Sequence, residues 1–114
     1  APMAPLNSFY DDVARLRIVR AHLREVPPAL KAGNFAKARK SFHNFDDSWD
    51  SIEDLIKTRN ADSYVAIEKG MIAIEKALMP DKPDVGQVTA MINEVMRVYN
   101  DALAEVVKDA RARQ

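Results

Sequence analysis

Cysteine is absent from the 114-residue sequence, which excludes disulfide bonds, thiol catalysis and thiolate metal ligands. Glycine is scarce, with three residues, and the six prolines stand near the N-terminus and between apolar segments. This distribution fits a helical protein better than a sheet protein. No apolar run reaches the roughly 18 residues that a membrane-spanning helix requires. A nucleophile elbow, a phosphate-binding loop, an HExxH motif and a nucleotide fingerprint are also lacking, so we predict that the protein is not an enzyme.

Net charge is also lacking, because 17 Lys and Arg residues balance 17 Asp and Glu residues. A formal net charge of zero argues against nonspecific nucleic-acid binding. The distribution is nevertheless uneven: residues 1–45 are mainly basic, whereas residues 46–54 hold five acids and no base. We expect the basic residues to flank these acids and neutralise them within the fold. The alternative is a dipolar surface that steers a partner.

Apolar residues recur at steps of three and four in four segments, which is the spacing of buried helix faces. These residues are Phe9, Val13, Leu16, Val19, Leu23 and Val26; Phe35, Ala38, Phe42, Phe45, Trp49, Ile52 and Ile56; Tyr64, Ile67, Met71, Ile74 and Leu78; and Val88, Ile92, Val95, Tyr99, Ala102 and Val106. Val65, Ile72 and Met79 widen the third face, and we expect the methionines to fill the core rather than bind copper.

The breaks between these segments set the predicted helix ends. Pro27-Pro28 ends the first helix, and a short turn over residues 28–32 follows. The second helix is predicted over residues 35–59. Candidate N-caps are Asn7 or Ser8, Asn34, Asp62 or Ser63, and Asp84. Gly70 lies within the third helix, at a cost of roughly 1 kcal/mol relative to Ala, and suits close approach of a neighbouring helix.

Four amphipathic helices with short joints predict an all-α fold, an antiparallel up-down-up-down four-helix bundle. Residues 1–6 are expected to form a flexible tail, and residues 7–114 a single domain. The first residues, Ala-Pro-Met-Ala-Pro, resemble what signal peptidase leaves after cleavage at small residues. We therefore expect a periplasmic or otherwise extracytoplasmic protein.

The reversal at residues 60–61 brings acidic residues of the second and third helices together. In this register, residues whose numbers sum to about 121 face each other. Glu53 then faces Glu68, and Asp46 faces Glu75, with His43 one turn further along. Two pairs of opposed acids are therefore expected to line one groove of the bundle.

Opposed carboxylates repel each other unless a cation or a proton intervenes. Carboxylate combined with imidazole suits iron, manganese or zinc, and bundles often build metal sites from Glu and His on facing helices. We therefore predict a metal ion, with iron, manganese, zinc and copper as the candidates. Its candidate ligands are Asp46, Asp50, Glu53, Glu68, Glu75 and His43.

The alternative interpretation is that each acid pairs with a base and forms an ordinary solvated face. Glu53 with Lys57, four residues later, is an example of such a pair. His22-x-x-Glu25 is a second pair of metal-ligand types on one helix face. Two residue types at one spacing are a weak signal, and a structural histidine is the better interpretation.

Residues 32–103 resemble a known helical domain. The likeness depends on Ala32 to Ala38, Phe42, Phe45, Trp49 to Asp54, Tyr64 to Glu68 and Val98 to Asn100. Together they are similar to the helical extracytoplasmic domain of bacterial Ftr-type iron permeases and to the related EfeO-like iron-uptake proteins. The resemblance implies iron handling outside the membrane, and it implicates Glu53, Glu68, Asp50 and Tyr64. The membrane part of the permease, with its Arg-Glu-x-x-Glu helices, has no counterpart in this sequence.

The PsbQ-like photosystem subunits offer a second, purely architectural comparison, since they are also four-helix bundles with a proline-bearing start. It implies a structural or adaptor subunit of a larger membrane complex. The main expectation is a metal-binding protein, with a membrane permease as possible partner.

Overall fold

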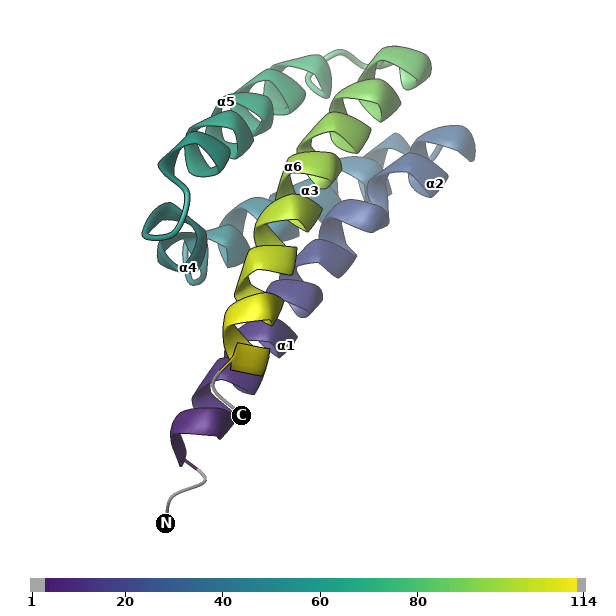
Figure 1. Ribbon diagram of the computed structural model, residues 1–114. Coiled ribbons are helices and arrows are strands. Elements are labelled where there is room, and N and C mark those ends of the chain that lie inside the picture. The colour runs from purple at the N-terminus through teal and green to yellow at the C-terminus, as the bar shows by residue number, and fades with distance from the viewer. Residues whose placement is uncertain (1–3, 113–114) are drawn as a thin grey trace.

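The computed structural model describes residues 4–112, and side chains from residue 11 onward (Figure 1). This part of the chain is all-helical and contains no strand. Its helices are α1 (Ala4–Arg24), α2 (Val26–Lys31), α3 (Phe35–Trp49), α4 (Glu53–Lys57), α5 (Ala61–Ala77) and α6 (Val85–Ala112). None of the helices in residues 4–112 has an apolar stretch long enough to cross a membrane.

Both ends of the first helix differ from the prediction. α1 begins at Ala4, within the expected tail of residues 1–6, so neither Asn7 nor Ser8 is its N-cap; residues 1–3 lie outside the described part. The helix stops at Arg24, and the prolines stand in the first turn of α2, where a missing N–H costs no helical hydrogen bond. Gly33, which follows α2, takes a φ of 73°, a conformation that favours glycine at the end of a helix.

Three N-cap predictions are tested by hydrogen bonds in the structure. Asn34 is confirmed, since its Oδ1 accepts from the backbone N–H of Lys37 at 3.2 Å. Asp84 is also confirmed, because its Oδ1 accepts from the N–H of Gln87 at 3.0 Å. For α5 the prediction was wrong by a few residues: Asn60 is the cap, and its side chain accepts from the N–H of Ser63 at 3.0 Å.

The predicted continuous helix over residues 35–59 is interrupted. α3 ends at Trp49, and α4 begins at Glu53. In the turn between them, the Ser51 hydroxyl donates to the carbonyl of Ser48 at 2.7 Å, which competes with the helical hydrogen-bond pattern. Arg15 of α1 donates to the carbonyl of Ser51 at 2.8 Å and holds the turn from outside. Trp49 and Ile52 are nevertheless both 1% exposed, so the break keeps the apolar face buried.

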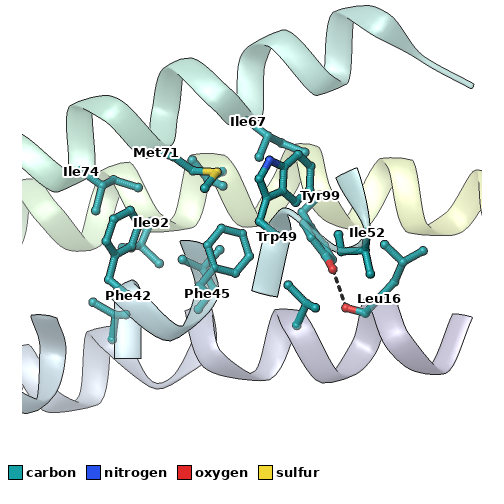
Figure 2. Close-up of a cluster of buried hydrophobic side chains, with 14 of the residues drawn as sticks. Leu16, Phe42, Phe45, Trp49, Ile52, Ile67, Met71, Ile74, Ile92 and Tyr99 are labelled. Atoms are coloured by element: carbon teal, nitrogen blue, oxygen red, sulfur yellow. Dashed lines mark hydrogen bonds between the residues drawn. The ribbon is translucent and has the colours of Figure 1, made fainter. Parts of the chain in front are cut away.

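Helix α6 is the central element of the packing. It packs against α1, α2, α4 and α5, whereas α3 packs mainly on α1 and α2 (Figure 1). The core between them contains a row of aromatic side chains from α3, with residues of α5 on one side and α1 on the other (Figure 2). Tyr99 of α6 joins this row, and its hydroxyl donates to the buried carbonyl of Leu16.

Helix α5 packs chiefly on α6 and α4 rather than along α3. Its predicted inner residues Ile67, Met71 and Ile74 are buried. Val65, Ile72 and Met79, which were expected to widen this inner face, are exposed instead. The prediction failed because it assumed that a neighbouring helix covers each flank of α5.

Gly70 lies where α5 and α6 approach each other closely, as predicted. A Cβ atom added there would collide with Cγ2 of Val95. Gly86, in the first turn of α6, has only the side chain of Asp84 near the same position, at 3.7 Å. Glycine is therefore required for packing at residue 70 and not at residue 86.

We predict that Gly70→Ala lowers the free energy of unfolding. Overpacking typically costs about 1–3 kcal/mol, which outweighs the helix propensity of Ala, worth up to about 1 kcal/mol. Gly86→Ala is the matched control and should leave stability unchanged or slightly raised. Urea unfolding followed by circular dichroism measures both. Equal effects of the two variants would contradict the close contact at Val95.

Candidate functional site

The candidate ligands lie between α3–α4 on one side and α5 on the other. We call this set the acidic strip; it consists of Asp46, Asp50, Glu53, Glu68 and Glu75. Acids approach each other in the predicted register: Asp46 and Glu75 line one pocket, and the charge of Glu68 is near enough to Glu53 to raise the pKa of Glu53. The strip thus brings acids from three helices to one side of the molecule.

Around Trp49, the strip meets the aromatic core. The indole Nε1 donates to Oε1 of Glu68 at 3.0 Å, and the ring stacks on that of Tyr64 at 6.3 Å between centroids. Partial burial is the main cause of the raised pKa of Glu53, followed by the charges of Glu68 and Asp50. Lys57 lowers this pKa only in part, and its Nζ lies 5.0 Å from the centre of the Tyr64 ring.

At the other end, the strip borders a pocket of about 200 Å³. Its lining residues are Arg39, Phe42, His43, Asp46, Glu75, Leu78 and Met79. Burial is the largest cause of the raised pKa of Asp46, followed by the charges of Asp50 and Glu75, and His43 opposes the rise. His43 lines the pocket, yet its Nε2 pairs with Asp47 outside the strip at 3.3 Å.

Arg39 is a site residue that the sequence reasoning missed. Its Nε donates to the carbonyl of Leu78 at 2.7 Å, and its Nη2 donates to that of Pro80 at 2.6 Å. These bonds tie the C-terminal end of α5 to α3 beside the pocket, and they satisfy carbonyls that the helix leaves unpaired. The available signal was position, since residue 39 is one turn before His43 and on the same face of α3.

The acids of the strip are not neutralised by neighbouring bases. Within residues 11–112, no Lys or Arg nitrogen lies within 4.0 Å of a carboxylate of the strip. The arginines of α1 do not neutralise it as expected: Arg15 pairs with Asp12 at 3.5 Å, and Arg20 donates to Asn100 at 3.1 Å. The example pair Glu53–Lys57 forms no ion pair either. Negative charge therefore accumulates along the strip.

The six predicted ligands do not converge on one point. Across residues 11–112, no group of three or more His, Asp or Glu side chains has the arrangement of a preformed metal site. Instead, the ligand candidates divide into a Glu53–Glu68 pair and an Asp46–Glu75 pair, with Trp49 between the two along α3. Asp50 is exposed, and its charge acts on both pairs. A cation held by either pair would need water for its other ligands.

The weaker His-x-x-Glu candidate does not form a site. His22 is half-buried, while Glu25 accepts a hydrogen bond from the Ser41 hydroxyl at 2.9 Å, which links the α1–α2 joint to α3.

Comparisons with protein-family models, with curated proteins and with solved structures found no match for this chain.

The raised pKa values predict a pH-dependent effect of removing these charges. A raised folded-state pKa means that the protonated form favours the fold; this contribution is complete below the unfolded pKa of about 4 and is lost as the pH rises through the folded pKa. Asn and Gln mimic the protonated acid. Asp46→Asn and Glu53→Gln should therefore raise the free energy of unfolding at pH 7, and the gain should vanish near about pH 3.

Glu94→Gln is the control of opposite sign. The hydrogen bond from Arg97 lowers the pKa of Glu94, so the charged form stabilises the fold above the unfolded pKa. This variant should lose stability at pH 7 and resemble the wild type at low pH. Urea titrations at both pH values measure all three variants. Loss of stability in Asp46→Asn and Glu53→Gln at pH 7 would show that these acids are compensated.

Proposed function

We propose that the protein binds a metal ion at the acidic strip and serves in metal uptake or handling outside the cytoplasm, without catalysing a reaction. The observation that carries this proposal is that acids from α3, α4 and α5 face each other with no Lys or Arg within ion-pair distance in the described residues. A cation relieves the repulsion between opposed carboxylates, and carboxylate oxygens suit hard and borderline cations.

Each pair would contribute different chemistry to such an ion. Asp46 and Glu75 offer two oxygens, and His43 at the same pocket can add an imidazole nitrogen after leaving Asp47. Glu53 and Glu68 offer carboxylates only, and Glu68 already accepts the indole N–H of Trp49, which orients it. The mixed donor set at the pocket favours iron, manganese or zinc, and the resemblance to iron-permease domains makes iron the first ion to test.

Calorimetric titration of the metal-free protein with Fe(II), Mn(II), Zn(II) and Cu(II) tests this proposal. The variants Glu53→Gln/Glu68→Gln and Asp46→Asn/Glu75→Gln each remove one pair. Loss of a ligand pair should weaken binding by about tenfold or more, equivalent to about 1.4 kcal/mol. Asp101→Asn/Glu105→Gln, on the exposed face of α6, removes the same charge elsewhere and should bind like the wild type.

Two results would refute the metal proposal. One is the absence of heat with every ion, and the other is an equal loss of affinity in the α6 control, which would indicate a general charge effect.

A structural or adaptor subunit of a larger membrane complex is the second candidate function. It is favoured by the large apolar side chains that α5 leaves exposed.

We also propose that the helices form an up-down-up-down four-helix bundle in which α1–α2 and α3–α4 each serve as one interrupted arm. The chain reverses at Gly33, at Asn60 and in the segment before α6, which supports this arrangement. An experimental structure with neighbouring arms crossing near about 20° would agree with it.

A further inference from the structure

Three large apolar side chains stand on one exposed face at α5. Val65, Ile72 and Met79 are 44%, 55% and 70% exposed. Val65 and Ile72, seven residues apart, lie on one side of α5, and Met79 follows just after the helix ends at Ala77. Ile18 on α1 is the remaining large apolar residue of this exposure among residues 11–112. We call these three residues at α5 the apolar stripe, whereas Ile18 lies alone on α1.

The apolar stripe borders the acidic strip along its length. Glu68 and Glu75 follow Val65 and Ile72 by three residues each, so they are helix-surface neighbours. Asp46 of α3 and Asp50, in the turn after α3, add negative charge from the opposite side. Lys69 and Lys76 lie on the other, outward edge of the stripe. One edge of the stripe is thus rich in carboxylates, and none of them forms an ion pair with Lys or Arg among residues 11–112.

The stripe also ends in a cavity. Met79 is a lining residue of the pocket of about 200 Å³, together with the buried side chains of Phe42 and Leu78. These three give the pocket an apolar wall, and Asp46, Glu75, His43 and Arg39 complete its lining. The guanidinium of Arg39 is held by the carbonyls of Leu78 and Pro80. Such a pocket suits one large apolar side chain as an anchor, with positive charge beside it.

We propose that the apolar stripe and the acidic strip bind a cationic amphipathic helix of a partner protein. Its apolar residues, at helical spacing, would cover Val65 and Ile72 and place one side chain in the pocket beside Met79. Its Lys or Arg residues would face the carboxylates of the strip. Val65 and the end of α5 at Ala77 lie about 18 Å apart at 1.5 Å per residue, and Met79 lies just beyond, so the stripe matches a partner helix of about three to four turns.

Fluorescence anisotropy with labelled model peptides tests this proposal. The probe is an 18-residue Leu/Lys peptide with helical amphipathic spacing, and the charge control is the same peptide with Glu in place of Lys. EDTA is present throughout, so the result does not depend on metal binding. The Leu/Lys peptide should bind, more weakly as ionic strength rises, and the Leu/Glu peptide should not.

Matched variants locate the binding surface. Ile72→Ser/Met79→Ser should weaken binding of the Leu/Lys peptide by about tenfold or more. Ile18→Ser makes the same kind of substitution on α1 and should leave peptide binding unchanged. Asp46→Asn/Glu75→Gln should weaken binding and reduce its salt dependence. Ile72→Ser alone, which leaves the pocket residues unchanged, should weaken peptide binding and keep the wild-type metal titration, so that failure of one proposal is distinguishable from failure of the other.

Several outcomes would overturn the proposed partner. These are no binding of the Leu/Lys peptide, equal binding of both peptides, or an equal effect of Ile18→Ser. Concentration-dependent dimerisation in sedimentation equilibrium, abolished by Ile72→Ser/Met79→Ser, would show that a second copy covers the stripe instead. Binding to phosphatidylglycerol vesicles that requires Lys69 and Lys76 would assign the stripe to a lipid surface.

Discussion

The hydrogen bond between Trp49 of α3 and Glu68 of α5 connects the two sides of the acidic strip. The indole ring lies within the aromatic core, 6.2 Å from Phe45 and 6.2 Å from Tyr99 between ring centroids. The indole nitrogen of Trp49 points toward α5 (Figure 2), where the carboxylate of Glu68 accepts its hydrogen bond. A buried indole N–H needs an acceptor, and Glu68 meets this need across a boundary where the α3 and α5 backbones pack little. The relative position of α3 and α5 is therefore fixed by side chains.

This arrangement explains why acids are tolerated so close to the core. Glu68 gains a hydrogen bond at Trp49, and Asp46 stays at the margin of a pocket that water can enter. The cost appears in the raised pKa values of Asp46 and Glu53, which have both burial and neighbouring carboxylates as causes. A protein that kept these acids only for solubility would gain by spacing them apart. Their pairwise approach is the basis of the proposed role in binding a cationic group.

Much of the fold could be predicted from the sequence, because the apolar period identifies which residues are buried. Phe45, Trp49, Ile67 and Tyr99 all lie in the core. The same period concealed the break at residues 50–52, since Trp49 and Ile52 keep their three-residue spacing across the turn. Exposure of Ile72 was unpredictable for a different reason: it depends on how far α5 stands from α3, and that distance is a property of tertiary packing.

The sequence could predict which acids face each other, but not that the six candidate ligands divide into two separate pairs. One reversal near Asn60 suffices to bring Glu53 near Glu68 and Asp46 near Glu75, so residue numbers counted from the reversal predict both pairs. The role of Arg39 requires knowing where α5 ends, because its partners are the backbone carbonyls of Leu78 and Pro80. Backbone acceptors carry no residue identity, and a sequence pattern therefore cannot reveal them.

The short helix α4 has a consequence for the mobility of the strip. Its five residues, bounded by turns on both sides, are too few to remain helical without tertiary contacts. Ile56 is its buried anchor, and Glu53 is its first residue. Local opening of α4 would therefore move Glu53 away from Glu68 while Asp46, on the longer α3, keeps its place beside Glu75. The two acid pairs thus belong to segments with different local stability, and slow hydrogen exchange should extend further into α3 than into α4.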